Sequence, residues 1–106
     1  KALELLKACD KSITIHGEGG DEEIVFIGGG DADMRLHVAR CLKEAGFVTQ
    51  THDRPGLQGM SPGNICNRCR TRAGLQLELS RGLRKRFFRS LGRDDRLHPS
   101  VSGSRV

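Results

Sequence analysis

The stretch that decides the fold is IVFIGGGDADMRLHVARCLKEAGFVTQT, residues 24–51. It opens with a β-branched and aromatic run, which is typical of a strand buried on both faces. After three glycines, apolar residues recur at helical spacing: Met34, Val38, Cys41, Leu42 and Ala45. Asp31 or Asp33 is expected to cap this helix, and Gly46 to end it. Residues 47–51 resume as a strand, and a helix between two strands favours an α/β sheet.

Upstream of this stretch, a short helix is expected over residues 2–9, followed by a strand over residues 12–16. The strand alternates strictly, so that Ile13 and Ile15 point to one side and His16 to the other. His16 is expected to end the strand, because a glycine-rich loop follows it.

Downstream, residues 54–72 are rich in Pro, Gly and Asn and predict a long loop with one short helical turn. Residues 75–79, LQLEL, alternate as a strand with three leucines on one face. Residues 81–91 form a basic amphipathic pattern typical of a helix. We therefore predict an α/β fold with an open mixed sheet flanked by helices over residues 1–91, and a polar, disordered tail over residues 92–106.

Charge is unevenly distributed along the 106 residues, which carry a net charge of +5. Residues 1–67 hold seven basic and ten acidic side chains, whereas residues 68–106 hold eleven basic and three acidic ones. A basic half of this strength favours a polyanionic partner, although a solvated Arg-rich helix and tail would give the same count. No apolar run approaches the roughly 20 residues of a membrane span, so no membrane partner is expected.

His16 and Glu78 are candidates for chemistry, because each lies near the carboxyl end of a predicted strand. An imidazole that binds a metal and a carboxylate that acts as a base suit metal-assisted hydrolysis. The alternatives are an ordinary histidine at the end of a strand and a glutamate on its solvent face. The other histidines, His37, His52 and His98, are expected to be plain surface residues.

The segment NICNRC, residues 64–69, has two interpretations. Cys66 and Cys69 have the spacing of half a zinc knuckle or of a redox pair, but the two further ligands of a structural zinc site are missing. Alternatively, Asn67 and Arg68 bind a substrate, since a guanidinium grips a carboxylate with two parallel hydrogen bonds.

Four landmarks occur in a fixed order: IHG at 15–17, VFIGG at 25–29, NICNR at 64–68, and GLQLELS at 74–80, with Arg84 just beyond. In this combination the sequence resembles the poly-γ-glutamate hydrolase family, zinc peptidases of bacteriophages and bacteria. The resemblance implies an open α/β fold similar to that of carboxypeptidase A-like zinc peptidases.

The resemblance also implies roles for single residues. Such enzymes hold Zn²⁺ with two His and one Glu, and His16 would be the last of these three ligands. Glu78 would be the general base, Arg68 together with Asn67 would bind a substrate carboxylate, and Arg84 would be a second anion contact. Because nothing before His16 supplies the other two ligands, we expect the C-terminal half of a catalytic domain, with an incomplete zinc site and no activity alone.

The expected function is zinc-dependent hydrolysis of γ-glutamyl amide linkages in an anionic polymer or a γ-glutamyl peptide. The alternative is a basic nucleic-acid-binding or interaction module. Four Phe and no Trp or Tyr leave few platforms for base stacking, which makes a nucleic-acid partner the weaker hypothesis. No secretory signal pattern opens the sequence, so we expect a cytoplasmic location or release by phage lysis.

Overall fold

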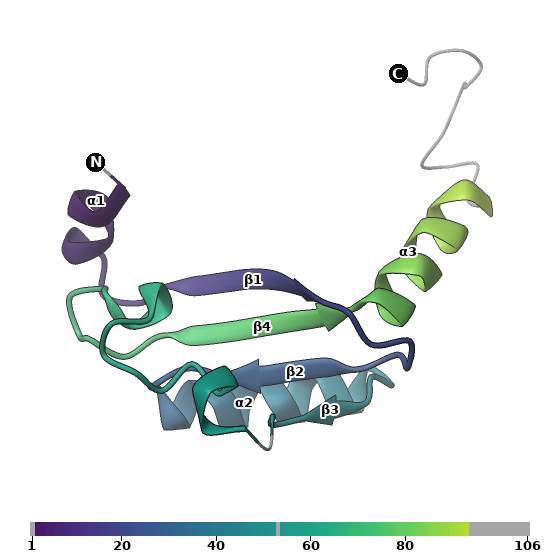
Figure 1. The fold of residues 1–106 in the computed structure, drawn as a ribbon, viewed down its shortest axis with the longest axis horizontal. Coiled ribbons are helices and arrows are strands. Elements are labelled where there is room, and N and C mark those ends of the chain that lie inside the picture. Colours follow the sequence, from purple (N-terminus) through teal and green to yellow (C-terminus); the bar gives the residue numbers. More distant parts are fainter. Residues whose placement is uncertain (1, 53, 94–106) are drawn as a thin grey trace, which may run out of the picture.

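The computed structural model describes residues 2–52 and 54–93, which form one mixed sheet with helices around it (Figure 1). The helices are α1 (Ala2–Ala8), α2 (Ala32–Glu44) and α3 (Arg81–Arg93), with two 3₁₀ turns, η1 (Pro55–Leu57) and η2 (Ile65–Asn67). The strands are β1 (Ile13–Glu18), β2 (Val25–Gly28), β3 (Thr49–Gln50) and β4 (Leu75–Ser80). This arrangement confirms the predicted α/β class.

The sheet has the order β1-β4-β2-β3, so the last strand in sequence lies in the middle. β1 pairs with β4 in parallel, β4 with β2 antiparallel, and β2 with β3 in parallel. The sheet is therefore mixed. The carboxyl ends of β1 and β4 lie at one end of the sheet, and the carboxyl ends of β2 and β3 lie at the opposite end.

The core lies on one face of the sheet, between the strands and α2, which runs behind β2 and β3 in Figure 1. Val25, Ile27 and Leu75 are buried there together with Leu83 from the start of α3. These side chains belong to alternate positions of their strands, so the intervening residues face the other side. Alternation in β4 thus separates an apolar core face from a polar face.

The first half of the sheet follows the prediction closely, with small shifts at the ends. Asp31 caps α2 by accepting a hydrogen bond from the Met34 backbone N–H, and Gly46 follows the helix with φ +94°. β1 continues past His16 to Glu18, because its pairing with β4 carries the ladder through the expected loop. β3 is limited to Thr49–Gln50, which are its only residues paired with β2.

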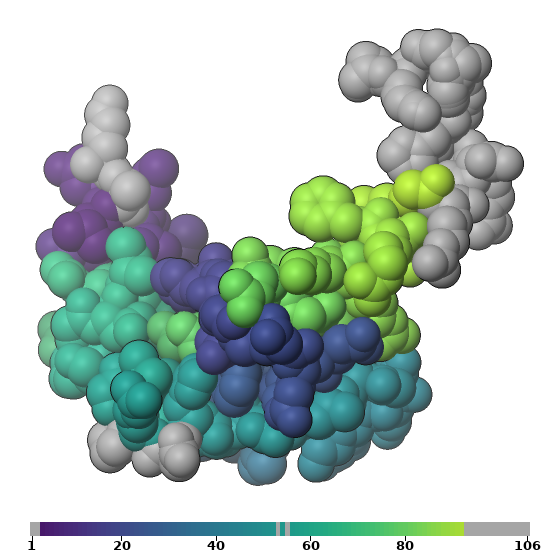
Figure 2. Space-filling model, turned by 45° about the vertical axis from the view of Figure 1, so that its right-hand side comes forward, coloured from purple at the N-terminus to yellow at the C-terminus, as the bar shows by residue number. Residues whose placement is uncertain are grey.

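Two helices leave the sheet at its ends, both on the side of the edge strand β1 (Figure 1). In the space-filling view α1 and α3 stand apart on the body of the molecule (Figure 2). α3 includes Gly92 and Arg93, so the expected tail is helical at its start; residues 94–106 lie outside the described residues. Within the described ranges, no helix has the length and apolarity needed to cross a membrane.

Candidate functional site

A row of side chains crosses the polar face of the sheet, opposite α2. His16 on β1 is the register partner of Glu78 on β4, and Glu78 is in turn the partner of Phe26 on β2. Laterally paired residues point to the same side of a sheet, with Cβ atoms about 4.5–5.5 Å apart. The structure therefore brings His16 and Glu78 together, in the middle of their strands rather than at the tips.

Glu78 is held by a residue that the sequence pattern did not single out. Its Oε1 lies 2.5 Å from Nε2 of His52, and both side chains are largely buried, with 17% and 12% exposed. The His52 ring stacks on Phe26 with 4.1 Å between centroids and 4° between planes. The prediction of His52 as a plain surface residue is therefore wrong. Its position two residues after Gln50, on the same side of an extended segment, was the only available signal.

Asn67 binds the protein's own backbone through its whole side-chain amide. Its Oδ1 accepts hydrogen bonds from the N–H groups of Gly30 (2.9 Å) and Gly74 (3.0 Å). Its Nδ2 donates to the carbonyls of Gly59 (2.7 Å) and Ser61 (2.9 Å). The side chain is 3% exposed, so this geometry supports a role in holding the loop rather than in binding a substrate.

Arg68 borders a basic hollow of about 540 Å³ near the amino ends of β1 and β4. The hollow is also lined by Lys7, Arg70 and Arg72. Arg70 pairs with Asp10, whereas no described residue forms a salt bridge with Arg68. Arg68 is half-buried and can therefore offer its guanidinium to an anion in the hollow.

Arg84 lies at the other end of β1 and on the other face of the sheet. A Cβ built on Gly17 would lie 3.1 Å from Cζ of Arg84, and Gly17 alternates with His16 along the strand. The guanidinium donates to the backbone carbonyls of Glu18 (3.0 Å) and Leu79 (3.2 Å). The structure therefore does not bring Arg84 to His16 and Glu78, and its contacts fasten the end of β1 to α3.

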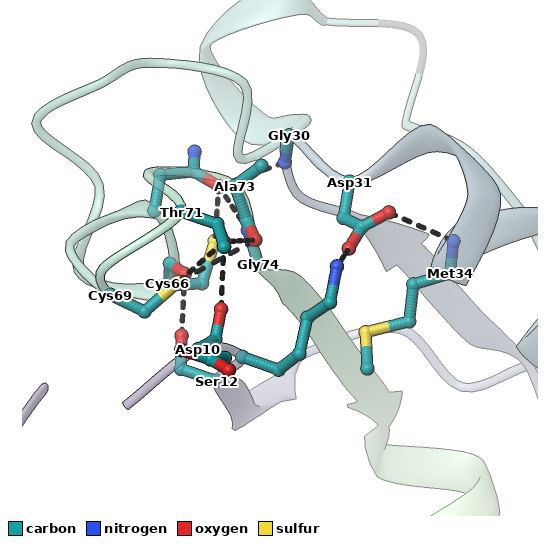
Figure 3. Close-up of polar contacts among 12 residues, drawn as sticks. Asp10, Ser12, Gly30, Asp31, Met34, Cys66, Cys69, Thr71, Ala73 and Gly74 are labelled. Carbon is teal, nitrogen blue, oxygen red and sulfur yellow. Dashed lines mark hydrogen bonds and ion pairs between the residues drawn. The ribbon is translucent and has the colours of Figure 1, made fainter. Parts of the chain in front are cut away.

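Polar contacts tie the start of β1 to the loop before β4 (Figure 3). Ser12 is buried and donates from Oγ to the Cys66 carbonyl at 2.6 Å.

Burial raises the pKa of the Cys66 thiol. Burial also opposes ionisation of Cys69, but hydrogen bonds led by those from Thr71 and Ser12 outweigh it and lower the pKa of that thiol. Both thiols are free and buried, so as thiols they contribute to the packing of the loop before β4.

An ion pair joins the segment before β1 to the start of α2 (Figure 3). Lys11 Nζ lies 2.5 Å from Oδ2 of Asp31, the residue that caps the helix. The hydrogen bond from Lys11, followed by that from the Met34 backbone N–H, lowers the pKa of Asp31. The ion pair thus keeps the capping carboxylate ionised.

The donor set fits only one position of a three-ligand metal site. The His16 side chain is exposed, and no described residue makes a hydrogen bond with its imidazole, so it can accept a metal. Among the described residues, however, no group of three His, Cys, Asp or Glu side chains could hold a metal ion. A complete site would need ligands from outside these residues.

Comparison with known proteins identifies the class to which this fold and this row of side chains belong. The profile of the Poly-gamma-glutamate hydrolase family matches residues 1–102, so the chain belongs to this family and the resemblance seen in the sequence is confirmed.

Three relatives from Bacillus subtilis strain 168 show similar identity. UPF0714 protein YndL is 32% identical over 90 residues, which are 83% of this chain and 35% of YndL. The SPbeta prophage-derived UPF0714 protein YoqZ is 32% identical over 83% of this chain and 32% of its own length. UPF0714 protein YmaC is 32% identical over 82% of this chain and 37% of its own length. The chain thus spans about a third of the length of these curated relatives.

Two solved structures share the fold. A bacteriophage poly-γ-glutamate hydrolase superposes with a TM-score of 0.74 at 26% identity, over 79% of this chain and 41% of that one. Zinc-free apo YndL superposes with a TM-score of 0.72 at 31% identity, over 80% of this chain and 43% of that one. The observed architecture is therefore that of part of these larger proteins.

Proposed function

We propose that this chain supplies the general base, one zinc ligand and a carboxylate-binding arginine to a zinc-dependent hydrolase of γ-glutamyl amide bonds. The observation that carries the proposal is the register pair His16–Glu78, on the polar face of the sheet in a chain of this family. The solved YndL structure is a zinc-free apo form, which indicates that this relative binds zinc and supports the same cofactor here.

Glu78 is the residue that moves a proton in this proposal. Its Oε1 is bound to His52, and no described residue donates to Oε2, so this second oxygen keeps its acceptor sites for a water molecule. The carboxylate takes a proton from that water as the water attacks the amide carbonyl, and then gives it to the leaving nitrogen. His16 contributes a neutral imidazole to the metal, and bound zinc would lower the pKa of water to about 7.

Arg68 binds a carboxylate of the substrate. Poly-γ-glutamate carries a free α-carboxylate on every residue, and the guanidinium offers a planar fork that matches it. The neighbouring cations of the hollow, Lys7 and Arg72, suit a chain of repeated carboxylates. Asn67 is left out of this substrate contact, because backbone groups occupy both atoms of its side-chain amide. Arg84 stays a proposed second anion contact, since Nε and Nη2 donate to carbonyls but no described residue binds its Nη1.

A chimera tests the proposal: residues 1–93 of this chain replace the matching part of the bacteriophage hydrolase. We expect the chimera to bind about one zinc, as in the three-ligand catalytic sites of such enzymes, and to cleave poly-γ-glutamate. Glu78→Gln should lower kcat by about 10²–10⁴-fold with zinc content unchanged, because only the base is lost. His16→Ala should lower both zinc content and activity.

Matched controls separate these effects from loss of folding. Glu22→Gln and His37→Ala change the same residue types at exposed positions and should leave zinc content and kcat unchanged. Full activity of the Glu78→Gln chimera would refute the assignment of the base, and full zinc content of the His16→Ala chimera would refute the assignment of the ligand.

A further inference from the structure

His52 lies against Glu78 and fixes the direction of its side chain. Nε2 of His52 and Oε1 of Glu78 lie 2.5 Å apart, so the two groups are in hydrogen-bonding contact. A carboxylate oxygen that accepts this bond requires a proton on Nε2 of His52. Among the described residues, no other hydrogen bond or salt bridge holds the Glu78 carboxylate.

Two further contacts hold His52 in this place, one to its ring and one to its backbone. Phe26, the register partner of both Glu78 and Gln50, provides the flat surface on which the ring stacks at 4.1 Å. The His52 carbonyl accepts a hydrogen bond of 2.7 Å from Nε2 of Gln58, which fixes the backbone just beyond β3. The ring therefore reaches across β2 from β3 to touch a residue on β4.

We propose that His52 is a positioning residue for Glu78: its Nε2–H binds Oε1 and leaves Oε2 directed to the reacting water. This inference rests on the proposed function of Glu78. It gives the segment after β3 a role in the site, although the four sequence landmarks do not include this segment. His52 contacts Glu78 from the side of β2, whereas His16 is paired with Glu78 on β1, so the two histidines flank the carboxylate from opposite sides.

The tautomer of His52 tests the contact in the 106-residue chain itself, without any activity. In ¹⁵N-histidine-labelled protein, we expect a His52 signal with a protonated Nε2 whose proton exchanges slowly with water. In Glu78→Ala this proton should exchange faster, whereas in His37→Ala, which changes an exposed helix residue, it should not change. A wild-type His52 with an unprotonated Nε2 would overturn the proposal, and this readout requires no variant to fold.

Kinetics of the active chimera separate positioning from packing. His52→Phe keeps an aromatic ring against Phe26 but removes the donor, whereas His52→Gln restores an N–H donor without the ring. We expect His52→Phe to lower kcat by about 10–100-fold with little change in KM, and His52→Gln to recover part of this loss. Wild-type kcat in His52→Phe, or no recovery in His52→Gln, would show that the ring only packs.

The two experiments fail in different ways. If the wild-type chimera does not cleave the polymer, the proposed function is refuted, and the NMR measurement still decides whether His52 donates to Glu78. If the chimera is active but His52 carries its proton on Nδ1 alone, the proposed function stands and the positioning role is refuted.

Discussion

Replacing Asn67 by alanine should unfold the loop before β4, because one amide connects four backbone groups. Asn67→Ala removes the partners of the Gly30 and Gly74 N–H groups and of the Gly59 and Ser61 carbonyls. The bonds to Gly74 and Gly59 are fully buried, so water cannot replace the lost partner there.

The expected cost follows from these two buried groups. Each backbone group left buried without a partner costs about 1–3 kcal/mol, so the pair predicts a loss of about 2–6 kcal/mol. The free energy of unfolding of a small domain is only about 5–15 kcal/mol, so this loss would be a large fraction of the total. Asn67→Asp should also destabilise, because its second carboxylate oxygen cannot donate and would face the Gly59 and Ser61 carbonyl oxygens as a buried acceptor.

Urea denaturation followed by circular dichroism measures this loss, and hydrogen exchange at the Gly74 N–H locates it. Asn64→Ala is the matched control in the same loop: Asn64 caps η2 through the Cys66 N–H and is more exposed. It should cost about 1 kcal/mol, as for a helix cap. If Asn67→Ala is no more destabilising than Asn64→Ala, the amide does not hold the loop and would be free to bind a substrate.

Two further changes test the packing of the helices. In α3, Gly82→Ala should destabilise the protein, because the new Cβ would lie 2.0 Å from the Asp21 carbonyl oxygen. At Gly92 a Cβ meets nothing within 4 Å, so Gly92→Ala should stabilise the protein by about 0.5 kcal/mol. Thermal melting of both variants compares the two effects directly. Folding lowers the pKa of Asp31, so the stability of the wild-type protein should fall as the pH drops from the ordinary aspartate pKa of about 3.9 through the lowered pKa. Asp31→Asn keeps the cap but does not titrate. Its melting temperature should therefore fall less over the same pH window. An equal fall in both proteins would contradict a role for the Lys11 ion pair in this pH dependence.

Periodicity predicted the elements of the fold but not their pairing. The helical spacing from Met34 to Ala45 and the alternation over residues 75–79 are local signals, and α2 and β4 follow them. The insertion of β4 between β1 and β2 depends on contacts between residues about 50–60 positions apart, and no local pattern records it. The long β1 has the same origin, because its last residues are extended by pairing with β4.

The site was predictable where side-chain direction follows from alternation. Glu78 stands between Leu77 and Leu79, so its position on the polar face could be read from the sequence alone. The contact with His52 could not, because it depends on the crossing from β3 over Phe26. Asn67 shows the opposite difficulty: its residue type suits a substrate, and only the structure reveals that backbone groups occupy its amide.

Alternation in β4 also couples the stability of the fold to the geometry of the site. Leu75 is fully buried in the core, and Glu78 stands three positions further along the same strand on the opposite face. A shift of β4 by one residue would expose the leucines and turn Glu78 into the core, away from both His16 and His52. The apolar packing against α2 therefore fixes which residue faces His16, and a substitution in this core should disturb the His16–Glu78 pair even though it touches neither side chain.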